Sequence, residues 1–395
     1  VIFKIMRNKI YFLLGVLCLT ILSSCKNQHR LVPGEDYAIA DMVQTIPIGN
    51  IQKDFAWHIW CGSMVKGYDG KYHLYYSRWP RPATTHGAWI SHSEVAYAVA
   101  ENPEGPFKFV NVALPQTDSL AWDGATTHNP YIMMKDGKYY LYYVGTQGKP
   151  LSAEETIPGY GTEWWIRRNT QRIGVAIADS PAGPWRRLNE PVLANNSKDS
   201  TAFDALCVAN PAICVGRNGK IVMLYKAVCK NEKLRGGEVR FSVAFADSPE
   251  GPFVKTNKQI FLPEDPKSSM VAEDPCIWYD DYTDCYYAIV RDVVGQFAGK
   301  ESGGLALLTS KDAIDWEAPK YPKVLPKILE FSDGSTYDAK VIGGVERPFL
   351  YRDEDGNPQL LFGAFSIHKG KVRRDHSFNG RIPLKLTDEI MKTRE

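Results

Sequence analysis

Short runs of apolar residues, separated by turns that contain Gly, follow one another along most of this chain. In the segment HNPYIMMKDGKYYLYYVG at 128–145, an apolar run, an Asp-Gly turn and an aromatic run come in succession. Two apolar or aromatic runs around such a turn are typical of an antiparallel hairpin. Almost no stretch repeats its apolar positions with the helical period of 3.6 residues. The pattern therefore predicts an all-β protein.

This unit occurs five times, and each copy starts at a small or polar pair that is often followed by Pro. The five pairs are Cys61-Gly62, His128-Asn129, Ala209-Asn210, Glu273-Asp274 and Glu346-Arg347. A Pro-x-Gly-Pro turn follows three copies at 103–106, 181–184 and 249–252, and a degraded relative at 311–316 follows the fourth. Proline removes a ladder N–H at these turns and forces a bend.

Each copy supplies about four short strands, which bury both faces only against neighbouring copies. Five such sheets packed radially around an axis leave few exposed edges. We therefore predict a five-bladed β-propeller over residues 38–395, with four-stranded blades around a central pocket. The fifth copy lacks an outer strand, and we expect residues 38–48 to supply it. A pair of β-sandwiches is the alternative fold.

The N-terminal residues have the pattern of an export signal. Lys4, Arg7 and Lys9 precede an apolar run at 10–22, which is short for a membrane span. The run ends in Leu-Ser-Ser-Cys at 22–25, which resembles a bacterial lipobox. This predicts a lipoprotein signal peptide over 1–24, lipidation at Cys25 and a tether over 25–37. The protein would be lipid-anchored in the cell envelope, in the periplasm or on the outer-membrane surface. An ordinary signal peptide with a chance cysteine is the alternative.

Composition narrows the function classes. The 395 residues are 44% hydrophobic and 23% charged, which excludes disorder and a polytopic membrane protein. The net charge of +2 includes three basic residues of the leader, so no attraction to nucleic acid is expected, and membrane contact is expected only through the lipid. The six cysteines after Cys25 lack zinc-binding spacing and are expected to be buried thiols. No cofactor is expected. The sequence leaves open whether a structural metal ion lies in the channel.

In a propeller, the start of every innermost strand lies at one end of the channel. The expected inner ring is Trp60, Cys61, His128, Asn129, Ala209, Asn210, Glu273, Asp274, Glu346 and Arg347. We expect Asp123 and Asp204, each six residues before an Asn of this ring, to join it. The expected outer ring includes Arg78, Lys226, Arg291 and Asp292.

Several carboxylates in one polar funnel suit glycoside hydrolysis, which needs one protonated carboxyl and one ionised. Each acid also has a structural alternative. Glu346 beside Arg347 would form a buried ion pair, Asp204 would cap a loop, and Asp274 would serve as a turn residue.

From about Gln52 onward the chain resembles the five-bladed propeller glycoside hydrolases of families 32, 43, 62, 68, 117 and 130. Family 43 enzymes place a base Asp directly before a Pro and an acid Glu two residues before another. Asp274 matches the first position and Glu346 the second. Trp60-Cys61-Gly62 stands where families 43 and 32 carry an Asp, so the chain is more similar to family 117-like relatives.

The resemblance, with adjacency in the repeat, implies a role for each candidate. Asp204 would be the base, Asp274 the orienting or pKa-tuning acid and Glu346 the general acid, with Glu273 and Asp123 in reserve. The expected substrate-binding residues are Asp123, His128, Asn129, Trp60, Glu273 and Arg347. Family 117 includes enzymes that use a histidine as acid, which makes His128 and His58 further candidates.

The leading hypothesis is an exo-acting glycoside hydrolase that cleaves a terminal sugar from plant or algal oligosaccharides. It would be inverting if it follows family 43. A long insertion at 147–172, expected to overhang the pocket, favours a terminal sugar. A non-catalytic glycan-binding lipoprotein and a phosphorylase like family 130 are the alternatives. Arg78, Lys226, Arg291 and Arg347 at the mouth would suit a uronic or sulfated sugar, unless they pair with the acids. The sequence leaves the oligomeric state open.

Overall fold

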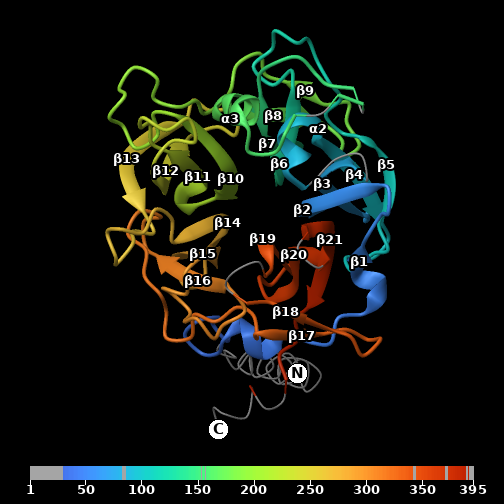
Figure 1. The fold of residues 1–395 in the computed structure, drawn as a ribbon. Coiled ribbons are helices and arrows are strands. Elements are labelled where there is room, and N and C mark those ends of the chain that lie inside the picture. The colour runs from blue at the N-terminus through green and yellow to red at the C-terminus, as the bar shows by residue number, and fades with distance from the viewer. Residues whose placement is uncertain are drawn as a thin grey trace, which may run out of the picture.

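The computed structural model describes residues 30–81, 86–152, 154–155, 157–340, 344–369, 372–387 and 390. Five antiparallel sheets stand around a central axis, which confirms the predicted five-bladed β-propeller (Figure 1). The predicted signal peptide over 1–24 and Cys25 lie outside the described residues.

The first three blades each have four strands that follow the chain from the axis outwards. The first contains β2 (Trp57–Lys66), β3 (Tyr72–Pro80), β4 (Glu94–Ala100) and β5 (Lys108–Val112). The second contains β6 (Thr126–Lys135), β7 (Lys138–Thr146), β8 (Arg172–Ala178) and β9 (Arg186–Arg187). The third contains β10 (Cys207–Val215), β11 (Ile221–Val228), β12 (Val239–Ala246) and β13 (Val254–Ile260).

The fourth blade has three such strands, β14 (Ala272–Asp280), β15 (Cys285–Asp292) and β16 (Leu305–Ser310). Two isolated bridges, Ala306–Lys323 and Thr309–Glu317, stand where the other blades have a fourth strand. This blade carries the degraded form of the turn, without the Gly-Pro of its counterparts, so its outer edge is irregular. A short hairpin of β17 (Ile328–Glu330) and β18 (Thr336–Asp338) follows.

The fifth blade joins the two ends of the chain. Its order from the axis is β19 (Glu346–Arg352), β20 (Pro358–Lys369), β21 (Val372–Pro383) and β1 (Ile51–Gln52). An N-terminal segment therefore completes this blade as expected, but its regular outer strand lies after the predicted residues. The outer strand is Ile51–Gln52, whereas residues 38–48 contribute the 3₁₀ turn η1 (Ile39–Met42), the start of η2 (Ile48–Asn50) and the Val43–Leu384 bridge.

Part of the segment predicted as a tether packs on the body. Val32 and Tyr37 are buried in a cluster that includes Trp278 of the fourth blade, and Arg30 pairs with Asp280 at 2.9 Å. These contacts fix the chain from residue 30 onward. Within the described ranges, no helix is long and apolar enough to cross a membrane.

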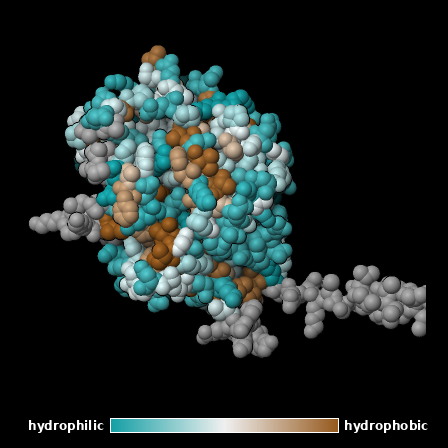
Figure 2. All heavy atoms as spheres, turned by 90° about the vertical axis from the view of Figure 1, so that its right-hand side faces the viewer, coloured by the Kyte–Doolittle hydropathy of each residue, from teal (hydrophilic) through white to brown (hydrophobic). Residues whose placement is uncertain are grey.

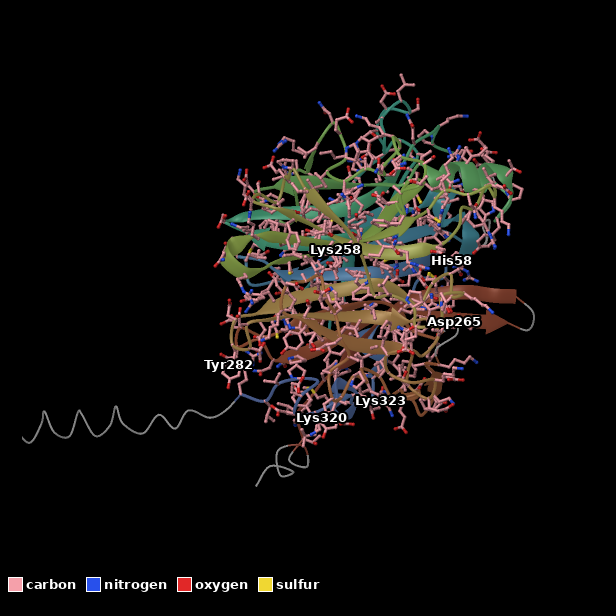
Figure 3. The ribbon with its side chains drawn as sticks, turned by 90° about the vertical axis from the view of Figure 1, so that its left-hand side faces the viewer. His58, Lys258, Asp265, Tyr282, Lys320 and Lys323 are labelled. Atoms are coloured by element: carbon pink, nitrogen blue, oxygen red, sulfur yellow. The ribbon has the colours of Figure 1, made fainter. Side chains whose placement is uncertain are left out.

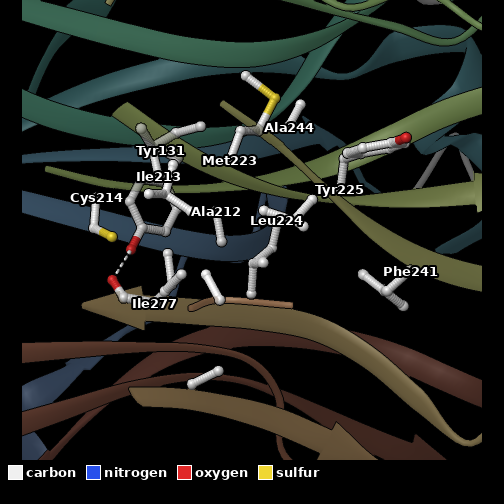
Figure 4. Close-up of a cluster of buried hydrophobic side chains, with 14 of the residues drawn as sticks. Tyr131, Ala212, Ile213, Cys214, Met223, Leu224, Tyr225, Phe241, Ala244 and Ile277 are labelled. Atoms are coloured by element: carbon white, nitrogen blue, oxygen red, sulfur yellow. Dashed lines mark hydrogen bonds between the residues drawn. The ribbon is translucent and has the colours of Figure 1, made fainter. Parts of the chain in front are cut away.

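The core lies within and between the blades. Figure 4 shows the contact between the second, third and fourth blades, where Tyr131 Oη donates to the Ile277 carbonyl at 3.3 Å beside Leu224 and Met223. The outer face over the first blade is largely hydrophilic, with some apolar side chains gathered in its middle (Figure 2). The cysteines at positions 61, 207, 214, 229, 276 and 285 are free thiols, and four of them are buried.

Candidate active site

The innermost strand of every blade has a β-bulge at the same position. The register shifts lie between Trp60 and Ser63 in the first blade and at the corresponding places in the other four. The residue at each bulge has a φ between 52° and 60°; these residues are Cys61, Asn129, Asn210, Asp274 and Arg347. A bulge re-aims side chains, and Asn and Asp tolerate this left-handed backbone better than most residues.

The five bulge residues form a connected floor across the channel. Cys61 Sγ donates to Asn129 Oδ1 at 3.2 Å, and Asn129 Nδ2 donates to Asn210 Oδ1 at 2.9 Å. Asn210 Nδ2 donates to Asp274 Oδ1 at 2.9 Å. Arg347 completes the floor with Nη1 at 3.0 Å from the same Asp274 oxygen and Nη2 donating to Asn210 at 3.2 Å.

This floor separates two spaces on the axis, a cavity of about 230 Å³ and a much smaller one of about 30 Å³. Four floor residues, Asn129, Asn210, Asp274 and Arg347, line both spaces. Because the connected floor lies between the two spaces, the larger cavity is blind at its base. Figure 3 shows the two ends of the propeller, with His58 at one and Tyr282 at the other.

The lining of the larger cavity has two chemically different parts. The third, fourth and fifth blades contribute charged residues: Lys226, Glu273, Asp274, Arg291, Glu346 and Arg347. The first blade, with the connection between its second and third strands, and the 147–172 insertion contribute aromatic residues: Trp60, Trp79, Trp89, Tyr160, Trp164 and Trp165. The remaining lining residues are Ser77, Ser93, His128, Asn129, Arg168, Gln171 and Asn210.

Strand register brings the cations to the carboxylates. Arg291 on β15 stands opposite Glu273 on β14, and Lys226 occupies the equivalent position on β11. Glu273 accepts from Lys226 through one carboxylate oxygen and from Arg291 Nη1 through the other, at 2.7 Å. Arg291 Nη2 lies 3.2 Å from Glu346 Oε1, so this guanidinium links two carboxylates.

The same surroundings have opposite effects on the pKa values of two neighbouring acids. Burial alone would raise the pKa of Glu273, but Lys226 and Arg291 hold it well below the usual range, so Glu273 is ionised. Burial raises the pKa of Asp274 to about 6, and Glu273 and Glu346 add to this, against the opposing charge of Arg347. Such divergence between adjacent acids is typical of catalytic sites.

His128 lines the cavity as a neutral imidazole. Burial, reinforced by the charge of Arg347, lowers its pKa to about 3. Its Nε2 lies 2.9 Å from Gln171 Nε2, and its ring meets Trp89 edge-on at 5.0 Å. The other histidine candidate, His58, is buried beside Trp79, with 5.4 Å between ring centroids, and is not among the lining residues. A histidine that is neutral at the working pH is a poor proton donor, which argues against His128 as the general acid.

The insertion at 147–172 forms one wall of the cavity. Its helix α3 (Thr162–Asn169) packs against α2 (Trp89–His92), where Trp164 meets Trp89 edge-on at 5.4 Å. Trp164 Nε1 also donates to the Gly87 carbonyl at 2.7 Å. The insertion therefore covers the cavity as expected, as far as its described residues show, and the Trp89 and Gly87 contacts position its aromatic face.

Seven of the nine predicted catalytic and binding residues line the cavity: Trp60, His128, Asn129, Glu273, Asp274, Glu346 and Arg347. Asp123 and Asp204 do not. Asp123 accepts from Tyr143 at 2.7 Å and from Arg187 on β9 at 2.8 Å, and Asp204 pairs with Lys255 on β13 at 2.5 Å. Each Asp lies on a loop that turns outward to the last strand of its own blade, so the expected convergence on the pocket was wrong.

An Asp204→Asn substitution tests whether Asp204 has a structural role beside Lys255 or a catalytic role in the cavity. We expect it to lower the free energy of unfolding by roughly 1–3 kcal/mol, because a charge-assisted contact to Lys255 is weakened in a buried setting. The turnover number should change by less than about twofold, since the side chain lies away from the cavity. Denaturant unfolding and steady-state kinetics check both values; a thousandfold loss of turnover in a folded variant would restore Asp204 as the base.

Two members of the expected outer ring also lie elsewhere. Arg78 pairs with Glu94 at 2.8 Å, and its guanidinium carbon lies 4.0 Å from the ring centroids of both Trp57 and Phe109. Asp292 accepts three backbone N–H groups from residues 296–298 and fixes a loop. The sequence reasoning assigned no site role to Ser77, Ser93, Tyr160 or Gln171. Of these four, only Ser77 could have been predicted to line the cavity, because it occupies the strand position equivalent to Lys226 and Arg291.

No protein-family model matches the chain, and no curated protein sequence matches it. Solved structures do. Zg3597, a family 117 glycoside hydrolase from the marine bacterium Zobellia galactanivorans, is 21% identical, with 84% of this chain and 85% of that chain covered and a TM-score of 0.54. CoXyl43, a family 43 β-xylosidase/α-arabinofuranosidase from a compost microbial metagenome, is 15% identical over 88% and 96%, with a TM-score of 0.53.

A thermostable family 43 glycoside hydrolase is 14% identical over 84% of this chain and 91% of that chain, with a TM-score of 0.52. At these identities the likeness concerns the fold. The resemblance inferred from the repeat is confirmed at that level, since the similar structures are family 117 and family 43 glycoside hydrolases. Among the described residues, no group of three or more His, Cys, Asp or Glu is placed to hold a metal ion.

Proposed function

We propose that this protein is an exo-acting glycoside hydrolase that removes a terminal sugar from plant or algal oligosaccharides. One observation carries the proposal: three carboxylates from two neighbouring blades face an aromatic wall across a single blind cavity. Flat aromatic faces stack on the apolar faces of sugar rings, and carboxylates supply the acid and the base of glycoside hydrolysis.

Asp274 is assigned as the general base. Its two contacts, to Asn210 and Arg347, are both made to Oδ1, and the described residues offer no donor to Oδ2. A base works best with a pKa near the operating pH, and the value of about 6 meets that condition. Asp274 Oδ2 would remove a proton from the water that attacks the anomeric carbon.

Glu346 is assigned as the general acid. It shares Arg291 with Glu273, but Glu273 also has Lys226 and the shorter contact to the guanidinium. Glu273 orients both cations, and Glu346 stands at the Glu-x-Pro position that family 43 enzymes use for their acid, so Glu346 is assigned this role. Glu346 would donate this proton to the glycosidic oxygen as the bond to the anomeric carbon breaks, in a single inverting displacement.

The blind base of the cavity supports exo action. The floor of five bulge residues closes the channel, so a polysaccharide cannot pass through the propeller axis. A chain end can enter, with its terminal sugar between the charged and aromatic walls.

Two measurements test this function on plant and algal oligosaccharides. Chromatography should show release of monosaccharide, and kcat/KM should rise with pH through an apparent pKa near 6, because Asp274 must lose its proton to act as a base. A fall of kcat/KM through the same value would reverse the roles and make Asp274 the acid. Turnover only with inorganic phosphate would indicate a phosphorylase, and binding without turnover a glycan-binding protein.

A further inference from the structure

The cavity carries more cations than carboxylates. Glu273, Asp274 and Glu346 are its acids, against Lys226, Arg291, Arg347 and Arg168. Lys226 and Arg291 pair with Glu273, Arg291 also with Glu346, and Arg347 with Asp274. Three of the four cations therefore have carboxylate partners.

Arg168 is the exception. It lies near the C-terminal end of α3, and only 9% of the residue is exposed. Its Nη1 donates to Asn169 Oδ1 at 3.2 Å and to the Arg235 carbonyl at 3.4 Å, both neutral acceptors. Its guanidinium carbon lies 5.7 Å from the Trp165 ring centroid. No carboxylate in the described part of the chain pairs with it, whereas the adjacent Arg167 has Glu163 at 3.6 Å.

A buried guanidinium without a counter-ion is costly, because it loses hydration that neutral acceptors replace only in part. Its place near a helix C-terminus offsets part of this cost. The interaction with the helix C-terminus does not explain why Arg168 lines the cavity. Contacts to Asn169, Arg235 and Trp165 fix the group in advance, and a planar guanidinium binds oxyanions in two-point geometry.

We propose that Arg168 recognises an oxyanion on the sugar substrate, so that the enzyme prefers an anionic sugar over its neutral counterpart. The oxyanion would be a uronate carboxylate or a sulfate ester, which present the same acceptor chemistry to a guanidinium. This inference rests on the proposed function for the kind of ligand, but it concerns binding rather than hydrolysis. The element that carries Arg168 belongs to the insertion rather than to the repeated blades.

Calorimetry with matched oligosaccharides tests this role. The ligands end in a uronic acid, in a sulfated sugar, or in the corresponding neutral sugar, and binding is measured to the wild type and the Arg168→Gln variant. We expect the wild type to bind at least one anionic ligand about tenfold or more tightly than its neutral counterpart. R168Q should reduce this ratio to below about threefold and leave the affinity for the neutral ligand unchanged.

Arg235→Gln is the matched control. It removes the same charge from an exposed side chain beside the cavity and keeps the backbone carbonyl that Arg168 contacts, so the ratio should persist. Equal or tighter binding of the neutral ligands, no binding of any anionic ligand, or a ratio that survives R168Q would overturn the inference.

The uronate and sulfate arms identify which oxyanion is recognised. Anionic binding without hydrolysis would support Arg168 while contradicting the proposed function. Hydrolysis confined to neutral ligands would do the reverse, so the two claims fail separately.

Discussion

Replacing Asp274 with asparagine is expected to lower the turnover number by about a thousandfold while the protein stays folded. A general base contributes roughly 10²–10⁴ to the rate, and the amide removes the proton acceptor without changing the size of the side chain. The fold should survive because Arg347 and Asn210 both contact Oδ1, an acceptor that asparagine keeps. Steady-state kinetics on the oligosaccharide that the wild type cleaves, with melting temperature as the check on folding, measures the effect.

Asp204→Asn is the matched control, since it is the same chemical change in a buried carboxylate outside the cavity. Its turnover number should stay within about twofold of the wild type. If Asp274→Asn kept more than about a tenth of the activity, Asp274 would not be the base. Loss of activity in Asp204→Asn alone would return the base to the loop before the third blade.

Replacing Arg347 with methionine is expected to give the largest loss of stability. Its guanidinium connects Asp274 to Asn210 at the centre of the floor, and removing one partner of a buried ion pair costs about 3–5 kcal/mol. Burial already raises the pKa of Asp274 to about 6, and Arg347 is the main group that opposes this rise. The pKa should therefore rise further in the variant.

This sign fixes the pH dependence of the loss. In the variant, the pKa of Asp274 is higher in the folded protein than in the unfolded chain. Protonation of Asp274 therefore favours the folded state, and the protein loses stability as pH rises through the raised pKa. Denaturant unfolding should show a larger difference between wild type and Arg347→Met at pH 8 than at pH 5. Arg186→Met removes a mostly exposed partner of Glu250 and should cost at most about 1 kcal/mol at both values. A loss that is equal at both pH values would mean that Arg347 acts by packing alone.

The repeat made the fold and the inner ring predictable. Because the five starts fall at equivalent places in similar units, closing the sheets into a propeller brings Asn129, Asn210 and Asp274 to one axis. The equivalence holds even in the first blade, where Cys61 takes the bulge position despite its different chemistry.

The same reasoning failed for Asp123 and Asp204, although their offsets in the repeat are also equal. Their locations depend on Arg187 and Lys255, which lie on the last strands of the second and third blades, far along the chain. Equal offsets thus indicated a shared structural role rather than a shared catalytic one. A pattern within one chain gives the equivalence of two positions but not the direction in which their loops turn.

The cavity wall was predictable in kind but not in detail. The length of the 147–172 insertion indicated a cover over the pocket, and its residues Trp164 and Trp165 line the cavity. The difference between Arg167 and Arg168 was not accessible, because it depends on the insertion forming a helix, which brings Arg167 next to Glu163 four residues earlier, and on the packing that turns Arg168 to the cavity. Neighbouring residues of the same type therefore have different roles that only the packing reveals.

The most direct test of the account is a crystal structure of the Asp274→Asn variant with an oligosaccharide that the wild type cleaves. We predict the terminal sugar inside the blind cavity, on the aromatic side lined by Trp60 and Trp164, with the Glu346 carboxyl within hydrogen-bonding distance of the glycosidic oxygen. A sugar bound anywhere else, or bound here with its glycosidic oxygen out of reach of Glu346, would contradict the account.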